Sequence, residues 1–210
     1  METSKAYSRR KRDGFFDLLR GRGIDIGCGD DPVTSDCVQW DKAQGDAQEM
    51  FGVLEESFDW VYSSHCLEHL VDVQAALRRW WTLIKPGGLL ILFVPCRDLY
   101  EKKQRLPSQM NAEHKHFFLP EHDDPPDTIG LLPLCRALFP DGKMVRFQVC
   151  DAWCESGQEY SIECILQKLK LCIYCHKPEE FGSDTSTGYI CEKCLYCQML
   201  REENKEQRSC

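Results

Sequence analysis

The chain has 210 residues, enough for one well-cored domain and a small appended module. Its formal net charge of −8 gives no overall field that would gather nucleic acid on its surface. No apolar run approaches the ~20 residues of a membrane-spanning helix, and the charged N-terminus lacks the apolar core of a signal peptide. We therefore expect a protein of the cytoplasm with no membrane partner.

The cysteines are unevenly spread along the chain. Fourteen cysteines would suggest disulfides in a short secreted protein, but five of them crowd into residues 172–197 in C-x-x-C spacing. The other nine are dispersed. Reduced thiols with a local metal site fit this distribution better than a disulfide framework does.

The first forty residues predict a short helical segment and two strands. The basic run 8–12 fits a solvated helix face, and residues 15–19 have helical spacing. A first strand is expected over 23–26 and a second over 37–40, ending at Asp41. Only a turn or a stub of helix fits between these strands, because Pro32 interrupts the segment.

The middle of the chain predicts two buried strands around an amphipathic helix. A buried strand is expected over 58–64, a helix over 72–84 and a second apolar strand over 89–94. The run Pro86-Gly87-Gly88 ends the helix. The strand 89–94 is the most apolar of the chain, as a central parallel strand should be.

The second half of this domain opens with a long polar connection over 96–126. Loops of this length inside a compact domain are functional lids or disorder. A helix is then expected over 128–139, despite Pro133. Two strands, over 144–149 and 160–169, follow and are joined by a turn.

A glycine-bearing turn follows the first strand. Gly27 and Gly29 leave the backbone bare at the strand end, where an open α/β sheet holds a small ligand. Acids follow at Asp41 and Asp46, and then come two longer motifs, FDWVYSSHCLEHL over 58–70 and KPGG over 85–88. With these motifs the chain resembles the class I S-adenosylmethionine-dependent methyltransferases, and is most similar to the small type 11 group.

The resemblance implies a Rossmann-like three-layer sandwich, with a mostly parallel sheet and an antiparallel C-terminal edge hairpin. The family normally has a full helix between its first two strands, and this chain departs from that pattern. A nicotinamide-dependent enzyme is the competing interpretation of the turn. Against it, the third glycine of a G-x-G-x-x-G motif falls on Pro32, and no full helix remains to receive a pyrophosphate.

S-adenosylmethionine needs close backbone approach and a carboxylate for its ribose hydroxyls. The two glycines and Asp41 answer these needs. The resemblance implies that Asp46 and Ala47 meet the adenine, and that Ser64 and His65 lie at the methionine portion. The predicted cofactor-binding residues are Asp25, Gly27, Cys28, Gly29, Asp41, Lys42, Asp46, Ala47, Ser64 and His65.

The acceptor end is expected to be histidine-rich. His65, Glu68 and His69 would share a helix face, and the long loop could bring His114 or His116 over them. This set resembles the divalent-metal site of small-RNA and ubiquinone-type O-methyltransferases, with His65 in place of a glutamate. Two alternatives stay open: Glu68 and His69 only stabilise the helix start, or a histidine acts as general base. The predicted catalytic residues are His65, His69 and His114.

The C-terminal cysteines have zinc-ribbon spacing. Cys172-x-x-Cys175 and Cys191-x-x-Cys194 are separated by fifteen residues that include a flexible, glycine-bearing turn region. Four thiolates around Zn²⁺ would supply folding energy to a segment with few core residues. Cys197 or His176 offers a variant ligand choice.

We therefore predict a methyltransferase domain over 1–170, a zinc-ribbon-like module over 171–199 and a flexible tail over 200–210. The predicted reaction is methyl transfer from S-adenosylmethionine to an oxygen of a small metabolite or glycan. The alternative is a non-catalytic adaptor of methyltransferase shape, whose ribbon binds a protein partner. A third hypothesis is a modifier of nucleic acid or protein that is guided by the ribbon. The overall negative charge disfavours it, whereas lysines near the ribbon favour it, namely Lys168, Lys170, Lys177 and Lys193.

Overall fold

The computed structural model of the protein describes residues 2–154 and 157–199. Contacts within the chain divide it into two compact units, Met1–Lys168 and Leu169–Cys210. In the described residues, every helix falls short of the length and apolar character that a membrane span requires.

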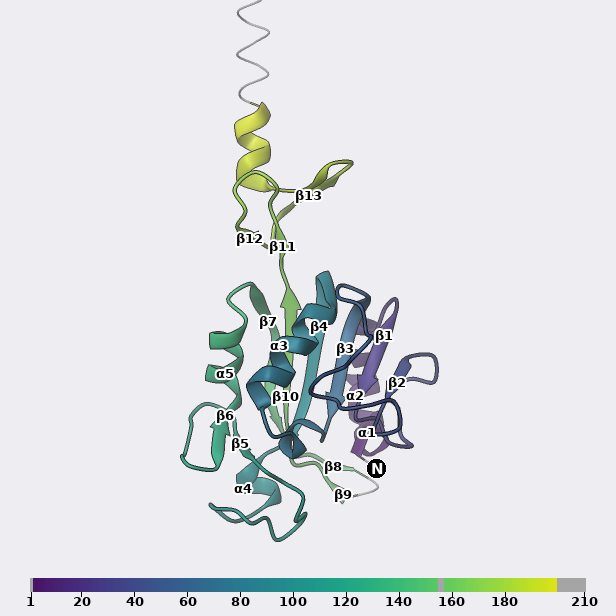
Figure 1. The fold of residues 1–210 in the computed structure, drawn as a ribbon, viewed down its shortest axis with the longest axis vertical. Helices are drawn as coiled ribbons and strands as arrows, with labels where there is room; N and C mark the ends of the chain where they lie inside the picture. The colour runs from purple at the N-terminus through teal and green to yellow at the C-terminus, as the bar shows by residue number, and fades with distance from the viewer. Residues whose placement is uncertain (1, 155–156, 200–210) are drawn as a thin grey trace, which may run out of the picture. The chain divides into compact units, whose positions relative to one another are not determined.

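The first unit is built on a six-stranded sheet (Figure 1). Its spatial order is β2 (Val38–Trp40), β1 (Gly23–Ile26), β3 (Phe58–Ser64), β4 (Ile84–Pro95), β10 (Ser161–Lys168) and β7 (Gly142–Cys150). The first four strands run parallel, and β10 is antiparallel to both of its neighbours. The predicted mostly parallel sheet with a C-terminal antiparallel pair is therefore confirmed.

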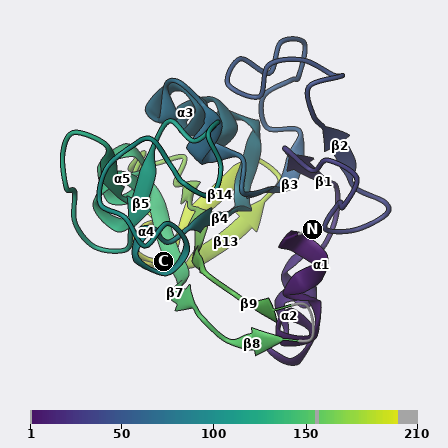
Figure 2. The ribbon, with the colours of Figure 1, turned by 90° about the horizontal axis from the view of Figure 1, so that it is seen from below.

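One face of the sheet is covered by α3 (Val73–Leu83) and α5 (Leu131–Leu138) (Figures 1 and 2). The Asp72 carboxylate caps α3 by accepting the Ala75 N–H at 2.9 Å, and Trp80 on the inner face of the helix is fully buried. The buried side chains of α3 and α5 form one hydrophobic core with those of the central strands. This core makes the strand ends a rigid base for a site.

Two elements differ from their predicted bounds. Strand β4 begins directly where α3 ends and includes the Pro86-Gly87-Gly88 run. Residues predicted as the start of the second helix instead form β6 (Thr128–Gly130), which pairs with β5 (Phe117–Leu119). Pro133 then lies in the first turn of α5, where a missing N–H leaves no helical hydrogen bond unmade.

The opposite face is covered by the N-terminal segment, namely α1 (Glu2–Lys5), α2 (Tyr7–Arg12) and the 3-10 helix η1 (Phe15–Leu18). The prediction of a solvated basic face is wrong for part of this segment. Arg10 is only 2% exposed, its guanidinium lies 4.1 Å from the Phe93 ring centroid, and its Nη1 donates to the Tyr62 hydroxyl at 2.8 Å. The amphipathic arginine stem and its planar head fill a place that an apolar side chain would normally take.

The long connection 96–126 is ordered by side-chain bonds. It begins with α4 (Arg97–Tyr100), and Arg97 donates to Asp124 at 2.7 Å. Residues 27–37 form turns and no helix, as Pro32 predicts. Both segments lie beside the ends of the parallel strands.

The second unit consists of two short antiparallel pairs and a helical stretch. β11 (Lys170–Leu171) pairs with β12 (Pro178–Glu179), and β13 (Gly182–Thr185) pairs with β14 (Gly188–Cys191). Residues 192–199 are helical. A further short pair in the first unit joins β8 (Trp153–Cys154) to β9 (Gly157–Gln158). The predicted tail 200–210 lies outside the described residues.

Candidate active site

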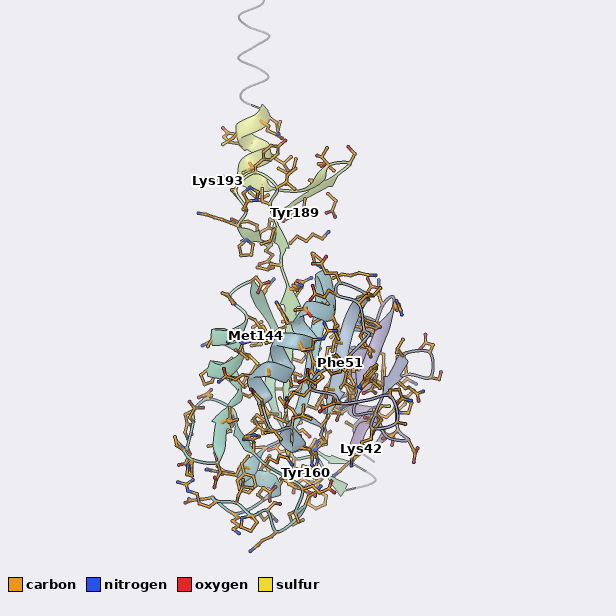
Figure 3. All side chains as sticks on the ribbon, viewed as in Figure 1. Lys42, Phe51, Met144, Tyr160, Tyr189 and Lys193 are labelled. Atoms are coloured by element: carbon orange, nitrogen blue, oxygen red, sulfur yellow. The ribbon has the colours of Figure 1, made fainter. Side chains whose placement is uncertain are left out.

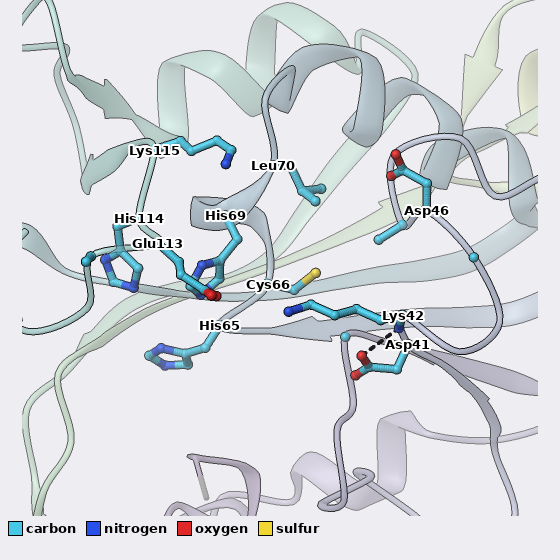
Figure 4. Close-up of a pocket in the computed structure, with 14 residues that line it drawn as sticks. Asp41, Lys42, Asp46, His65, Cys66, His69, Leu70, Glu113, His114 and Lys115 are labelled. Atoms are coloured by element: carbon cyan, nitrogen blue, oxygen red, sulfur yellow. Dashed lines mark hydrogen bonds between the residues drawn. The ribbon is translucent and has the colours of Figure 1, made fainter. Parts of the chain in front are cut away.

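A pocket of about 790 Å³ opens where β1, β2 and β3 end (Figure 4). This is the edge at which open α/β sheets bind their ligands. Figure 3 shows Lys42 at this end of the sheet. The lining residues are Gly27, Asp41, Lys42, Gly45, Asp46, Ala47, His65, Cys66, His69, Leu70, Ala112, Glu113, His114 and Lys115.

The turn after β1 has the left-handed backbone that glycine permits. Gly27 has φ +78° and Gly29 has φ +52°. A Cβ on Gly27 would lie 2.5 Å from Cys66 Cβ, whereas a Cβ on Gly29 would point into open space. The structural need for glycine at position 27 is therefore contact with a protein side chain, in addition to any ligand.

Asp41 ties the end of β2 to this turn. One carboxylate oxygen accepts the Gly29 N–H at 2.7 Å and the other accepts the Lys42 N–H at 2.6 Å. Each oxygen keeps a second lone-pair site. A bound diol could therefore donate to Asp41 without displacing its backbone partners.

The far wall of the pocket is formed by Gly45, Asp46 and Ala47. The exposed Asp46 lines the pocket, and its carboxylate accepts the Gln48 N–H at 2.7 Å. Leu70 adds an apolar surface to the same pocket. An acid beside an apolar surface suits a flat ring that carries an exocyclic amine.

Several predicted cofactor residues lie behind the pocket lining. Asp25 is 1% exposed, and its Oδ2 accepts the Val33 N–H at 2.7 Å. Its Oδ1 is buried and makes no hydrogen bond within the described residues. Burial raises the pKa of Asp25 to about 7 and that of the Cys28 thiol to about 11. Ser64, half-buried, ends β3 without lining the pocket.

The other end of the pocket holds histidines. His65 has φ +54°, and its Nε2 lies 2.9 Å from Ser161 Oγ. Burial, reinforced by the nearby charges of Arg10 and His114, lowers the pKa of His65 to about 3. Its ring is therefore neutral at neutral pH. Burial also lowers the pKa of His69.

Glu68 and His69 lie in η2 (Leu67–His69), and His114 approaches them from the long connection. Glu68 Oε1 is 3.9 Å from His69 Nε2, 3.9 Å from His114 Nε2 and 3.6 Å from His65 Nδ1. The structure thus brings His65, Glu68, His69 and His114 together, as the sequence predicts. Glu68 itself is buried behind the two rings.

His116 does not join this group, contrary to the expectation that either loop histidine could. Its Nε2 lies 3.2 Å from the Val71 carbonyl, beside a different hollow. The N–H groups of Lys115 and His116 both donate to the Glu68 carbonyl, at 2.8 and 3.2 Å. Because two consecutive N–H groups donate to one oxygen, the chain turns at Lys115. His114 therefore lies beside Glu68 and His69, whereas His116 lies beside Val71.

Sequence reasoning did not assign the pocket residues Gly45, Cys66, Leu70, Ala112, Glu113 and Lys115. Cys66 and Leu70 lie inside the quoted 58–70 motif, and Glu113 and Lys115 flank the predicted His114, so proximity was their only signal. Burial raises the pKa of the Cys66 thiol to about 12. Cys66 is therefore a neutral wall of the pocket and not a nucleophile.

The second unit gathers the four cysteines of the predicted ribbon. The sulfur atoms of Cys172, Cys175, Cys191 and Cys194 all lie within 4.8 Å of one another. The Cys191 N–H donates to Cys172 Sγ at 3.3 Å. Burial raises the pKa of the Cys172 thiol, but the backbone N–H groups that donate to its sulfur outweigh this effect and lower the pKa to about 6. Cys197 is exposed and, like His176, stands outside the cluster.

Some of the lysines near this unit have bonding partners within the protein. Lys168 donates to the carbonyls of Trp81 and Ile84 at 3.3 and 2.9 Å. Lys170 pairs with Asp184. Two of the four lysines that favoured nucleic acid are thus engaged within the protein.

Comparisons with known proteins agree with this fold. Residues 21–92 match the family described as methyltransferase domain. The trans-aconitate 2-methyltransferase of Deinococcus radiodurans is 37% identical over 68 residues, which are 32% of this chain and 25% of that protein. The match therefore spans a quarter of that relative's length.

Solved structures share the fold over most of the chain. A Thermotoga maritima protein, described as an S-adenosylmethionine-dependent methyltransferase and possible histamine N-methyltransferase, has a TM-score of 0.56 at 16% identity. The alignment covers 79% of this chain and 91% of that one. A Mesorhizobium loti S-adenosylmethionine-dependent methyltransferase has a TM-score of 0.50 at 11% identity, over 79% and 99% of the two chains.

The sheet order, the strand-end pocket and these likenesses define a Rossmann-like methyltransferase fold. Residues 21–92 match a methyltransferase domain, and the fold is that of S-adenosylmethionine-dependent methyltransferases, which confirms the predicted resemblance.

Proposed function

We propose that the protein transfers a methyl group from S-adenosylmethionine to an oxygen of a small organic acid or hydroxyl compound. The observation that carries this proposal is the pocket that joins Gly27, Asp41 and Asp46 at one end to His65 and His69 at the other. A pocket of about 790 Å³ is large enough for a nucleoside cofactor and a small acceptor together.

The residues present fit the cofactor. Asp41 retains lone pairs for two ribose hydroxyls, and Asp46 offers a carboxylate to the adenine amine. Asp25 lies behind the lining, where its Oδ2 accepts the Val33 N–H and helps to hold the segment after the turn in place. When bound, the cofactor supplies a methyl group activated by its sulfonium.

Methyl transfer by direct displacement needs alignment of the acceptor and removal of its proton. His65, His69 and His114 line the end of the pocket opposite Asp46, and burial lowers the pKa of His69, so its ring is neutral, the state a general base requires. Lys42 and Lys115 bring positive charge to a lining that also holds Asp41, Asp46 and Glu113, so the charge of the lining does not select the acceptor. The name of the Deinococcus radiodurans relative supports an organic acid as acceptor.

The proposal is tested by measuring S-adenosylhomocysteine release with a panel of acceptors: polycarboxylic acids including trans-aconitate, sugars, phenols and amines. We expect turnover with an oxygen acceptor and a loss of at least tenfold in His69→Ala. The matched control is His122→Ala, an exposed histidine outside the pocket. Turnover with amines alone would contradict an oxygen acceptor, and equal losses in both variants would remove His69 from the mechanism.

For the second unit, we propose that Cys172, Cys175, Cys191 and Cys194 bind one structural Zn²⁺. Four mutually close sulfurs from two C-x-x-C pairs suit a tetrahedral site of four thiolates. Such a site has no open coordination position, so its role is structure or protein-partner binding and not catalysis. A non-catalytic adaptor would share this unit but would bind no S-adenosylmethionine.

A further inference from the structure

Three metal-ligating side chains converge at the histidine end of the pocket. Glu68, His69 and His114 each offer one ligand atom, and these atoms lie within 4.8 Å of one another. We propose that they bind one divalent transition-metal ion, separate from the cysteine site of the second unit. Two imidazoles and one carboxylate suit Zn²⁺, Mn²⁺ or Fe²⁺ better than Mg²⁺.

The three ligands come from two separate parts of the chain. Glu68 and His69 are fixed by η2, whereas His114 is positioned by the two backbone N–H bonds to the Glu68 carbonyl. Glu68 Oε1 is 3.9 Å from the Nε2 atoms of both histidines. Metal bonds of ~2.0–2.2 Å place neighbouring ligand atoms about 3.0–3.5 Å apart, so binding requires the two Glu68–histidine distances to shorten by about 0.4–0.9 Å.

A second carboxylate orients His114. Its Nδ1 lies 2.7 Å from Glu101 Oε1, and Glu101 Oε2 accepts from Ser108 Oγ at 2.6 Å. All three side chains are buried. With a proton on Nδ1 donated to Glu101, the Nε2 lone pair of His114 points toward Glu68 and His69. Metal-bound histidines in proteins almost always have such a carboxylate or carbonyl partner.

The neighbouring histidines complete the boundary of this site. His65 Nε2 lies 2.9 Å from Ser161 Oγ, and its Nδ1 is 3.6 Å from Glu68 Oε1, so His65 supports the glutamate from its side of the pocket. His69 and His114 line the pocket beside Lys115. The remaining coordination positions of a bound ion would therefore face the acceptor. That placement of the acceptor rests on the proposed function, whereas metal binding itself does not.

The test is metal content of the full-length protein after equilibrium dialysis against Zn²⁺, and separately against Mn²⁺, which favours nitrogen and oxygen ligands over thiolates. We expect wild type to hold one more Zn²⁺ than His69→Ala and His114→Ala, and these variants to lose the Mn²⁺ ion. The matched control is His116→Ala, which should keep every ion. Glu101→Gln should weaken Mn²⁺ binding about tenfold to a hundredfold through the orientation of His114.

S-adenosylmethionine binding, measured by calorimetry on the same proteins, separates the two proposals and reports folding together with circular dichroism. A folded His69→Ala with the same Zn²⁺ and Mn²⁺ content as wild type would overturn the metal site, whatever the cofactor result. Loss of one ion with no cofactor binding in any protein would uphold the metal site and overturn the proposed function.

Discussion

Gly27 and Cys66 lie so close that the backbone of the turn after β1 runs directly against the side chain that follows β3. A Cβ at position 27 would meet Cys66 Cβ at 2.5 Å and Sγ at 2.6 Å. The turn therefore depends on a glycine for two reasons, its φ of +78° and the absence of space.

Gly27→Ala should lower stability by about 2–4 kcal/mol and weaken S-adenosylmethionine binding at least tenfold, because the clash moves the pocket wall. Urea unfolding and calorimetry measure the two effects. The control is Gly52→Ala, which has nearly the same φ, +80°, but open space around its Cβ. Gly52→Ala should cost only about 1 kcal/mol of backbone strain and leave binding unchanged. Equal effects of the two substitutions would contradict the steric explanation.

The buried Asp25 makes stability depend on pH. Its pKa rises from 3.8 to about 7 on folding, because burial disfavours the charged carboxylate. Between these values the folded state keeps a proton that the unfolded state has lost. Stability should therefore fall as pH rises from about 4 to 7, by up to about 4 kcal/mol over the whole window.

Asp25→Asn should remove this dependence, because the amide stays neutral while its oxygen can still accept the Val33 N–H. The measurement is the free energy of unfolding in urea at pH 5, 6, 7 and 8 for both proteins. The variant should gain stability relative to wild type as pH rises. Parallel curves would show that Asp25 is charged in the folded state.

Arg10 should contribute to stability as a core residue. Its guanidinium packs on Phe93 and donates to Tyr62, so Arg10→Ala leaves a cavity and removes one hydrogen bond from the Tyr62 hydroxyl. We expect a loss of about 2–4 kcal/mol in urea unfolding. Lys11→Ala, in the same helix but exposed, should change stability by less than about 0.5 kcal/mol. Similar values for the two variants would show that Arg10, like Lys11, contributes to stability only as a solvated surface residue.

The cysteine cluster predicts which thiol matters for zinc. Cys172→Ser should lower the Zn²⁺ content by one ion and make residues beyond 170 sensitive to proteases, because the small unit has few core side chains. Cys197→Ser should keep the ion, since this cysteine is exposed and outside the cluster. The reverse pattern would mean that Cys197 replaces a predicted ligand.

The fold was predictable where one local pattern decides the structure. Strand 58–64 carries Phe58 and the run Trp60-Val61-Tyr62 and was placed correctly, and Asp72 marks the start of α3. Residues 128–130 were not, because pairing with β5, which is distant in sequence, overrides their helical pattern. The burial of Arg10 was likewise not predictable. The sequence shows only its charge, whereas its burial depends on contacts with Tyr62 in β3 and Phe93 in β4.

Part of the candidate site was also predictable from the sequence. Strand-end position pointed to Asp41 and the family resemblance to Asp46, and both line the pocket. The sequence could not separate His114 from His116, because the choice depends on two backbone bonds to Glu68. Glu101, which holds His114, lies within a polar loop and carries no motif.

The most direct test of the account is calorimetric titration of the full-length protein with S-adenosylmethionine. We predict one binding site per chain in wild type, an affinity reduced about tenfold to a hundredfold in Asp41→Ala, and no change in Asp36→Ala, an exposed acid outside the pocket. Absence of binding in folded wild-type protein, or equal affinities for Asp41→Ala and wild type, would contradict the proposed cofactor site.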